Sequence, residues 1–301
     1  MGTSCTIGLV MRMALLIAIF MPVKESSAWG AQGHTLTALI ADELLSPSAR
    51  SQVKAILGSS DLADAALYLD THKSTLEKKI KDWHYDDRPT CESNVPRSKY
   101  CPGGNCASVQ LKRHYNILRV PQSSIEQKRF AIRVVAHLAG DIHQPMHAAD
   151  HDDAGGNAIK LTGTWNASAN LHSVWDSDFV KRAFSGNDFK GKSDRQIAAL
   201  LVQQISDSEK DIWTKGRVVT WLQESYGKAV DHAYGALPGF GCNEKDFATE
   251  PITLTDAYIG KSIESVPEQL KKGGVRLAAI LNRALSTDVD AAKAFVRADK
   301  L

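Results

Sequence analysis

The stretch His137-Leu-Ala-Gly-Asp141-Ile-His143-Gln-Pro145-Met-His147 combines helically spaced metal-binding side chains with a helix stop. His137 and Asp141 are four residues apart, so their side chains share one face of a helix. Pro145 ends such a helix, and the following turn would return His147 to the same region. Three imidazole or carboxylate donors thus converge. His143, two residues from Asp141, points away from that face, and we expect it to be an ordinary core or surface histidine.

Helical periodicity continues on both sides of this stretch and predicts one all-α domain, residues 29–301. Ser123 and Glu126 form the capping-box signature that would start the helix leading to Asp141. Residues 86–108 are rich in Pro, Gly, Asn and Cys, which predicts one long loop, and Ile159–Leu161 could form a short strand. The other predicted helices span residues 33–45, 47–57, 62–73, 109–118, 171–184, 193–206, 208–234, 255–270 and 274–285.

Residues 1–28 have the features of a secretory signal peptide. Arg12 precedes the apolar run Met13–Phe20, and Ser26-Ser27-Ala28 offers small residues for cleavage. The run is shorter than a membrane-spanning helix, and no other stretch of the chain could cross a bilayer. Cleavage would make Trp29 the first residue of a secreted or periplasmic protein without a membrane span.

Four cysteines follow that segment, and an even number in an oxidising compartment predicts two disulfides. Four cysteines allow three pairings. Cys101 and Cys106 flank the turn Pro102-Gly-Gly-Asn105 and could close a small loop, which would leave Cys91 to reach Cys242. A cysteine zinc site is the alternative, but the spacing matches no common zinc pattern.

Composition gives no strong electrostatic sign of nucleic-acid binding. The 301 residues carry a formal net charge of +2, so affinity for an anionic substrate has to come from a local site such as bound cations. The hydrophobic content of 43% is ample for a buried core.

More imidazole and carboxylate donors lie outside the central stretch. Such donors without thiolates favour hydrolytic zinc. Their number exceeds what one ion needs and indicates two or three ions that share a bridging carboxylate, an arrangement that serves phosphate-ester hydrolysis. These donors are the pair His172 and Asp176, again four apart, His34 with the α-amine of Trp29, His84, and Asp70, which we prefer to Asp61 and Asp64.

Taken in order, these elements resemble the trinuclear-zinc single-strand-specific nucleases and 3′-nucleotidases, the class I nucleases of plants and fungi. Bacterial zinc-dependent phospholipase C is a distant relative. The resemblance implies an all-α, single multi-helix domain with a short β-hairpin and long disulfide-stapled loops. It rests on Trp29-Gly-x-x-Gly-His34, Asp70, Trp-His84-Tyr, His137-x-x-x-Asp141-x-x-Gln-Pro-x-His147, Gly155-Gly156-Asn157 and His172-x-x-x-Asp176.

The resemblance also implies three zinc ions per chain, with Asp141 as the bridging ligand, and the disulfides Cys91–Cys242 and Cys101–Cys106. By position, the first zinc would be held by Asp70, His84, His137 and Asp141, the second by His147, His172 and Asp176, and the third by the amine and carbonyl of Trp29, His34 and Asp141.

A nucleobase pocket beside the metals is implied as well. Tyr85 falls where an aromatic ring stacks on the base and Asp87 where a carboxylate binds the base edge, whereas Ala154 and Asn157 would line the other wall. Lys73 suits a phosphate or the charge of the transition state, so the candidate catalytic residues are Asp70, Lys73 and Asp141. The plainer alternatives are a core aromatic for Tyr85, a loop charge or cap for Asp87 and a surface lysine for Lys73.

Two departures from the family pattern border this pocket. The segment between His147 and Gly155 is longer than expected and contains the acidic residues Asp150, Asp152 and Asp153, and residues 86–108 differ freely. The base preference of the chain is therefore left open.

We therefore predict a zinc-dependent extracellular endonuclease, acting as a monomer on single-stranded DNA and RNA to give 5′-phosphate products, with 3′-nucleotidase activity. Single strands are preferred because a stacked duplex hides the base from a pocket. The alternatives are a zinc-dependent phospholipase C and, from a different class, a non-catalytic zinc-storage or adhesion protein.

Overall fold

Helix α7 (Ile125–Asp141) is the helix from which the rest of the site is organised. Its N-terminus is capped by Ser124, whose side chain accepts a hydrogen bond from the backbone of Gln127 while the Gln127 side chain accepts one from Ser124. The capping box is thus one residue later than the predicted pair of Ser123 and Glu126. The hydroxyl of Ser123 is instead used in the preceding turn, where it donates to the carbonyl of Ile117.

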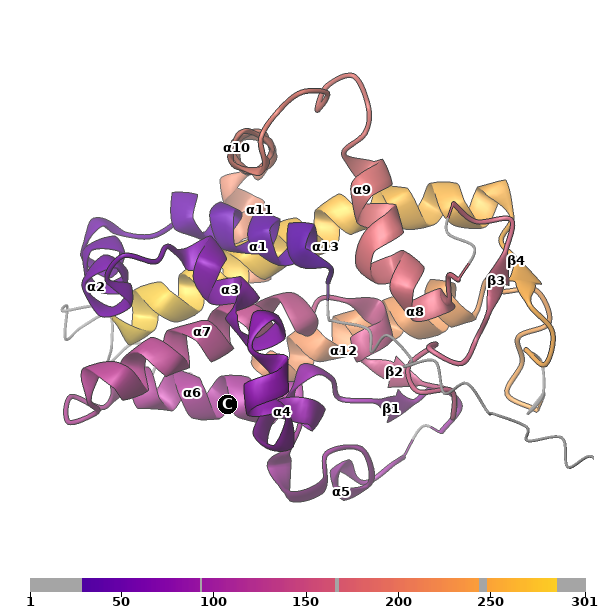
Figure 1. Cartoon of the computed structure of the whole chain (residues 1–301), viewed down its shortest axis with the longest axis horizontal. Helices are drawn as coiled ribbons and strands as arrows, with labels where there is room; N and C mark the ends of the chain where they lie inside the picture. The colour runs from indigo at the N-terminus through magenta and orange to yellow at the C-terminus, as the bar shows by residue number, and fades with distance from the viewer. Residues whose placement is uncertain (1–28, 93, 166–167, 244–247, 286–301) are drawn as a thin grey trace, which may run out of the picture.

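The computed structural model describes residues 29–92, 94–165, 168–243 and 248–285, and Figure 1 shows their arrangement. The predicted signal peptide, residues 1–28, lies outside the described residues. In chain order the other elements are α1 (Ala31–Glu43), α2 (Pro47–Leu57), α3 (Leu62–Thr71), α4 (Lys73–Ile80), η1 (Lys81–His84), β1 (Arg88–Pro89), α5 (Arg97–Tyr100), η2 (Pro102–Gly104), α6 (Ala107–Arg119), η3 (Pro145–His147), β2 (Ala149–Asp150), β3 (Leu161–Thr162), α8 (Leu171–Ser173), the π-helix η4 (Val174–Asp178), α9 (Phe179–Ala183), α10 (Asp194–Gln203), α11 (Asp207–Trp213), α12 (Val218–Lys228), the π-helix η5 (Ala229–Tyr234), β4 (Ile252–Thr253) and α13 (Asp256–Ala284).

The all-α class is confirmed, but the strands do not form the expected β-hairpin. β1 pairs with β2 and β3 pairs with β4, and both pairs are parallel. Antiparallel pairing among the described residues outside these strands is limited to the bridge between Lys160 and Asn170. The two strands of each pair are far apart in the sequence, so these short pairs join loops to distant parts of the chain.

Several helix boundaries differ from the prediction. The predicted helices 255–270 and 274–285 are one helix, α13, which continues through Pro267 because the neighbouring Val266 and Leu270 are buried in the core. The predicted helix 208–234 is broken after Trp213, where Gly216 adopts a positive φ. The segment from Lys73 to His84, which we did not predict to be helical, forms α4 and η1, and the predicted loop 86–108 contains α5 and η2.

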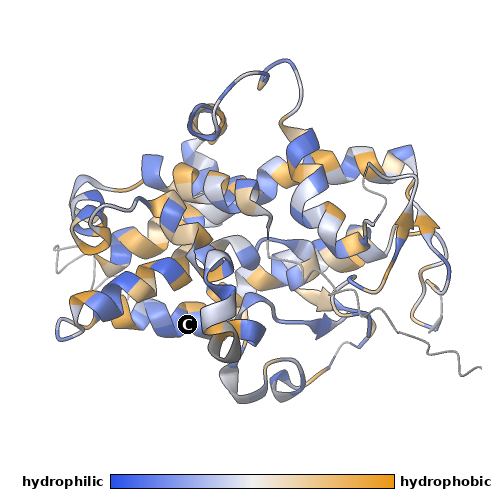
Figure 2. Ribbon diagram, viewed as in Figure 1, coloured by the Kyte–Doolittle hydropathy of each residue, from blue (hydrophilic) through white to orange (hydrophobic). Residues whose placement is uncertain are grey.

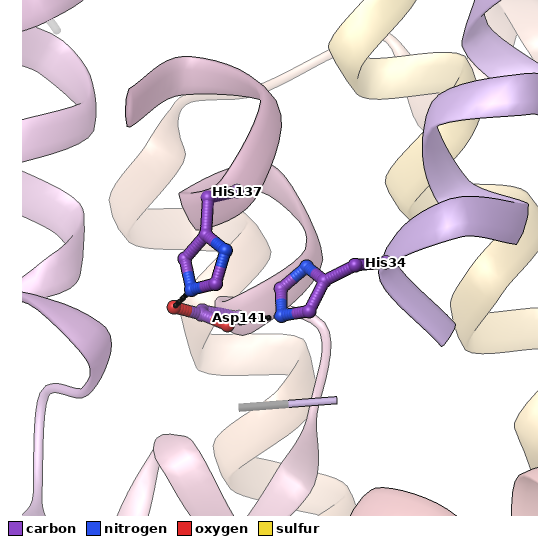
Figure 3. Close-up of side chains that lie close together, drawn as sticks. All are labelled: His34, His137 and Asp141. Atoms are coloured by element: carbon purple, nitrogen blue, oxygen red, sulfur yellow. Dashed lines mark ion pairs between the residues drawn. The ribbon is translucent and has the colours of Figure 1, made fainter. Parts of the chain in front are cut away.

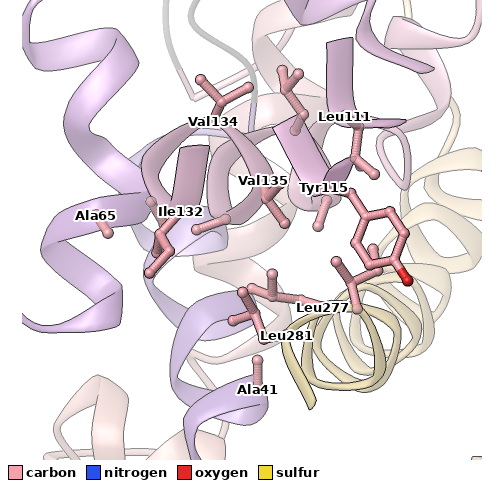
Figure 4. Packing of buried hydrophobic residues seen from close by; sticks show 14 of the residues in the cluster. Ala41, Ala65, Leu111, Tyr115, Ile132, Val134, Val135, Leu277 and Leu281 are labelled. Carbon is pink, nitrogen blue, oxygen red and sulfur yellow. The ribbon is translucent and has the colours of Figure 1, made fainter. Parts of the chain in front are cut away.

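One of the two hydrophobic clusters of the core surrounds α7. Hydrophobic and hydrophilic residues are interspersed along the longer helices (Figure 2), as in helices that bury one face against a core. Ile132 and Val135 of α7 pack between Ala65 of α3, Leu111 of α6 and Leu281 of α13 (Figure 4). This apolar surround fixes the position of the α7 C-terminus, where His137 and Asp141 lie.

Two disulfides join the cysteines that follow residue 28. Cys101 pairs with Cys106 and Cys91 pairs with Cys242, which confirms the expected pairing and excludes the cysteine zinc site. The second of these bonds closes a sequence separation of 151 residues. It holds the loop after β1 against the segment between η5 and β4.

Among the described helices, none combines the length and the apolar composition that a membrane-spanning helix needs.

Helix α1 reaches the site by crossing α13 at close range. A Cβ atom placed on Gly274 of α13 would lie 2.6 Å from the Cβ of Ile40 and 3.1 Å from the carbonyl oxygen of Thr37. Only a glycine permits this approach. The crossing therefore positions α1, the helix that carries His34.

We expect Gly274→Ala to lower the free energy of unfolding by about 1–3 kcal/mol, because the added methyl overpacks a rigid backbone contact. The matched control is Gly260→Ala in the same helix, where a Cβ would meet nothing within 4 Å. That change should be neutral or stabilise by up to about 1 kcal/mol, since alanine favours a helix interior. Urea denaturation of both variants measures the difference, and equal stabilities would contradict the close-crossing argument.

Candidate metal centre

Asp141 lies at the centre of a buried cluster of imidazole rings. Its Oδ1 is 3.4 Å from Nε2 of His34, and its Oδ2 is 3.3 Å from Nε2 of His137 (Figure 3). Nδ1 of His84 lies 3.3 Å from the same Oδ2, and Nδ1 of His147 lies 3.9 Å from Oδ1. Asp141, His34 and His137 are fully buried. The carboxylate therefore has imidazoles on both of its oxygens and no access to bulk water.

Different elements contribute these side chains. His137 and Asp141 share a face of the last turn of α7, as the spacing of four predicts. His34 comes from α1, which approaches α7 closely because position 140 is glycine: a Cβ there would lie 2.8 Å from Nδ1 of His34. The same atom would lie 3.6 Å from the indole of Trp29. The chain entering α1 is thus packed against the end of α7.

The donors form three groups, each with its ligand atoms within 4.8 Å of one another. Asp70 joins the cluster through Oδ1, which is 3.8 Å from Nε2 of His137. The competing Asp61 and Asp64 instead form the capping box of α3. The three groups are His34 with His137 and Asp141, Asp70 with His84 and His137, and His147 with His172 and Asp176.

In the third group, the Nε2 atoms of His147 and His172 are 3.0 Å apart. Oδ2 of Asp176 is 3.3 Å from Nε2 of His172.

Three of the rings are oriented by backbone carbonyl oxygens behind them. Nδ1 of His137 is 2.6 Å from the oxygen of Ala66, that of His147 is 2.8 Å from the oxygen of His84, and that of His172 is 2.6 Å from the oxygen of Gly155. A carbonyl can only accept, so each Nδ1 carries the proton. In its neutral form each ring then presents a lone pair on Nε2 to the interior of the cluster.

The Nε2 atoms of His147 and His172 face each other at 3.0 Å, so a proton or a metal ion has to lie between them. Burial opposes protonation of His147, but Asp176 and Asp141 raise its pKa to about 9, so this ring carries the proton until a metal ion replaces it. Both oxygens of Asp141, both ring nitrogens of His34, Nε2 of His84 and Oδ1 of Asp70 are buried without a hydrogen-bond partner. Buried polar atoms are almost always paired. A donor set of imidazoles and carboxylates that is left unpaired in this way fits metal ions as the missing partners.

The charges within the cluster also favour metal binding. Although burial disfavours its ionised form, the charge of His137 holds the pKa of Asp141 well below the usual range. Burial lowers the pKa of His34 and of His172, so these rings remain neutral and keep a free lone pair. Burial opposes protonation of His137 too, but Asp141 and Asp70 raise its pKa to about 9. This ring would release a proton when a metal replaces the proton as partner of these carboxylates.

Gln144 supports the cluster from behind, a role that the sequence did not indicate. Its Nε2 donates to Oδ1 of Asp176 at 2.6 Å, and its own Oε1 accepts from the backbone N–H of Met146. The predicted motif Gln-Pro-x-His contains this residue, but spacing alone assigned it no partner. The carbonyl groups of Ala66, His84 and Gly155 leave no sequence signal at all, because every residue has one.

His143 points away from the cluster, as expected. Its Nδ1 donates to the carbonyl of Ala139, and its Nε2 accepts from the buried guanidinium of Arg276 at 2.8 Å. Burial and the charge of Arg276 keep its pKa well below the usual range, so the ring is neutral. This ring thus joins α7 to α13.

Three of the residues expected at a base pocket, Asp87, Ala154 and Asn157, lie at one turn beside His172. A Cβ atom built on Gly155 would lie 3.7 Å from Oδ1 of Asp87, so the two residues are neighbours. The carbonyl of Gly155 orients His172. Ala154 and Asn157 belong to the same turn, in which Asn157 donates to the carbonyl of Ala154. Tyr85 is half-buried, and its hydroxyl donates to Asp82. The structure thus brings Asp87 to this turn.

The acidic segment after His147 forms a wall beside that turn. A cavity of about 640 Å³ is lined by Asp150, Asp152 and Asp153 together with His151. Burial, and then the charge of Asp150, raises the pKa of Asp87 well above its usual range, and burial raises the pKa of Asp153 to about 6. Lys73 lies elsewhere, as the first residue of α4 and three positions after Asp70.

We expect Gln144→Leu to weaken metal binding by about 10- to 100-fold, because partners of metal-binding carboxylates fix their orientation. A zinc titration against a competing chelator measures the change. The control is Gln110→Leu, which also removes a buried glutamine, but one that donates to the backbone carbonyl of Gly104 and not to a carboxylate. Unchanged zinc affinity in the Gln144 variant would remove this residue from the site.

Comparison with known proteins identifies the family. A model of the S1/P1 nuclease family matches residues 29–286. The chain is 30% identical over 268 residues to nuclease S1 of Aspergillus oryzae, covering 84% of this chain and 91% of that relative. It is 28% identical over 293 residues to endonuclease 2 of Arabidopsis thaliana (91% and 96% covered) and 28% identical over 276 residues to nuclease P1 of Penicillium citrinum (87% and 99%). The predicted resemblance is confirmed, and the chain belongs to the S1/P1 nuclease family.

Proposed function

We propose that this chain is a zinc-dependent endonuclease that cleaves single-stranded DNA and RNA to 5′-phosphate products and also has 3′-nucleotidase activity. Membership of a nuclease family supports hydrolysis of phosphodiester bonds. The observation that carries the metal dependence is the set of buried, unpaired nitrogen and oxygen atoms around Asp141. A storage or adhesion role would leave this family membership unexplained, and phospholipase C is not favoured by it.

The donor groups support three zinc ions, which would supply Lewis acidity toward the phosphoryl oxygens and activate water near neutral pH. We assign Asp141 as the residue shared by two of them, because both of its oxygens face imidazoles. Asp70, His84 and His137 would form the first zinc site together with Asp141. His147, His172 and Asp176 would form the second site. Trp29 and His34 would form the third site, again together with Asp141.

Trp29 would contribute its backbone rather than its side chain. We propose that signal-peptide cleavage after residue 28, on the way to a secreted or periplasmic location, frees its α-amine, a better ligand than a peptide nitrogen. The following residue, Gly30, donates its N–H to the carbonyl of Asp176 at 2.7 Å, which ties the start of the domain to η4. This bond keeps the chain entry beside His34 and the end of α7.

Substrate would be held by residues on the rim. Lys73 would balance the charge on the phosphate, next to Asp70. Tyr85 would stack on the base and Asp87 would bind its edge, with Ala154 and Asn157 on the opposite wall. A base can enter such a pocket only from a single strand or a flipped nucleotide, because a duplex keeps it stacked. We propose that a monomer carries out this reaction.

A substrate panel tests the proposed function directly. Protein ending cleanly at Trp29 should cleave single-stranded DNA and RNA and dephosphorylate 3′-AMP, should act much more slowly on duplex DNA, and should release nothing from phosphatidylcholine. Exhaustive chelation should abolish each activity, and zinc should restore it. Turnover of phosphatidylcholine without turnover of nucleic acid would support a phospholipase instead, and full activity after chelation would refute the metal dependence.

We expect Asp141→Asn to lower the cleavage rate by several orders of magnitude, because the loss of one charged oxygen disturbs two metal groups together. Elemental analysis should show that the zinc content falls as well. Asp42→Asn is the control, since Asp42 is paired with Arg50 at the surface. Near-normal rate and zinc content in the Asp141 variant would show that this carboxylate is not shared between metals.

A further inference from the structure

The turn at residues 153–157 connects the metal cluster to a buried tyrosine of η5. The carbonyl of Gly155 accepts from Nδ1 of His172 at 2.6 Å, and the carbonyl of Gly156 accepts from the backbone N–H of His172 at 3.3 Å. A further contact of the turn is with Tyr234, whose hydroxyl donates to Oδ1 of Asp153 at 2.7 Å. Tyr234 belongs to η5, which supplies none of the ligands assigned above. The turn therefore links a candidate metal ligand to an element outside the metal centre.

One peptide group carries this link. The carbonyl of Gly155 and the N–H of Gly156 belong to the same peptide bond, which is planar and trans, so the two groups point in opposite directions. The carbonyl accepts from His172, and the N–H donates to Oδ1 of Asp153 at 2.7 Å. The same Oδ1 accepts from Tyr234. The carboxylate polarises the peptide group through its N–H, which makes the carbonyl a stronger acceptor for the ring of His172.

The turn depends on such contacts because its backbone conformation is unfavourable. Ala154, Gly155 and Gly156 have φ angles of 58°, 63° and 83°. These angles lie in the left-handed region, which a residue with a Cβ such as Ala154 rarely adopts. Asp150 holds the first half of the turn, where its Oδ1 accepts from the N–H groups of Asp153 at 3.1 Å and Gly155 at 2.8 Å. Asp153 holds the second half, at Gly156.

Tyr234 is suited to keep Asp153 in this position. Its side chain is fully buried, in the hydrophobic cluster that also contains Leu171, the residue before His172. Burial, and then the charge of Asp153, raises the pKa of the Tyr234 hydroxyl well above its usual range, so the hydroxyl keeps its proton and stays a donor. Asp153 itself is half-buried and lines the cavity of about 640 Å³. Without the tyrosine hydroxyl, its carboxylate could turn toward this cavity and release Gly156.

We propose that Tyr234 is a positioning residue of the second metal site, which holds Asp153 against the peptide group between Gly155 and Gly156 and thereby fixes the carbonyl that orients His172. This inference rests on the proposed zinc-dependent function and extends it to an element that touches neither metal nor substrate.

Zinc retention by Tyr234→Phe tests the proposal, because this change removes the hydroxyl and keeps the buried ring. One of the three proposed zinc ions should dissociate at a free-zinc concentration about 3- to 10-fold higher than in the unmodified protein, less than the factor of about 10 to 100 for a direct partner of a ligand, because Tyr234 acts through Asp153. The other two ions should be retained as before. Elemental analysis after dialysis against a series of zinc buffers measures the change.

Variants of Asp153 test the same link at its next member. Asp153→Ala should cause a larger loss of the same zinc ion than Tyr234→Phe, and Asp153→Asn, which keeps an acceptor oxygen, should recover part of that loss. Zinc retention as in the unmodified protein in both Tyr234→Phe and Asp153→Ala would overturn the proposal.

The nuclear magnetic resonance signal of the Nδ1 proton of His172 tests the orientation itself, which a general loss of stability would not change. In zinc-loaded protein with isotope-labelled histidine, this signal is assigned by its absence from His172→Gln. In Tyr234→Phe it should shift and exchange faster with water, whereas the Nδ1 proton of His137, which donates to the carbonyl of Ala66, should be unaffected. An unchanged His172 signal would overturn the proposal even if the variant were less stable.

The matched control is Tyr115→Phe, which removes the hydroxyl of another buried tyrosine, in the hydrophobic cluster around α7. Zinc retention and both histidine signals should stay as in the unmodified protein. Equal zinc losses in Tyr115→Phe and Tyr234→Phe would overturn the proposal, since the effect would then not depend on the turn. Neither readout uses a substrate, so these outcomes are distinct from failure of the zinc-loaded, unmodified protein to cleave nucleic acid, which would refute the proposed nuclease function.

Discussion

The fully buried carboxylate of Asp141 is the constraint on which the rest of the structure depends. Burial of a charge is costly unless it is paired and solvated by other groups. Here the pairing comes from imidazoles on α1, α7, η1 and η3, so these elements have to meet at one point. The helical core around α7 supplies the rigidity that holds four separate segments in this position.

Two further features keep the cluster in a form that metals can use. Glycine at position 140 lets α1 lie against α7, and the carbonyl groups behind the rings fix which nitrogen carries the proton. With that orientation the Nε2 atoms of His147 and His172 face inward together at 3.0 Å, and the proton that they share can be replaced by a metal ion.

Around this fixed centre the side proposed for the base is rich in carboxyl groups. Asp87, Asp150 and Asp153 lie there, and burial near other carboxylates raises the pKa of Asp87 well above its usual range. A raised pKa favours the protonated form, so Asp87 adds little repulsion toward a polyanion.

The sequence by itself determined the all-α class, because helical periodicity can be recognised without coordinates. Its ordered motifs predicted the disulfide partners and the donor side chains through the family resemblance. His137 with Asp141 and His172 with Asp176 are local pairs, because a spacing of four residues places both side chains on one face of a helix. Only the tertiary structure decided what depends on distant segments: the parallel strand pairs in place of a hairpin, the continuation of α13 through Pro267, and the support of Asp176 by Gln144. These features depend on contacts between segments that are far apart in the sequence. No local spacing predicts such contacts, because they form only when the whole chain packs.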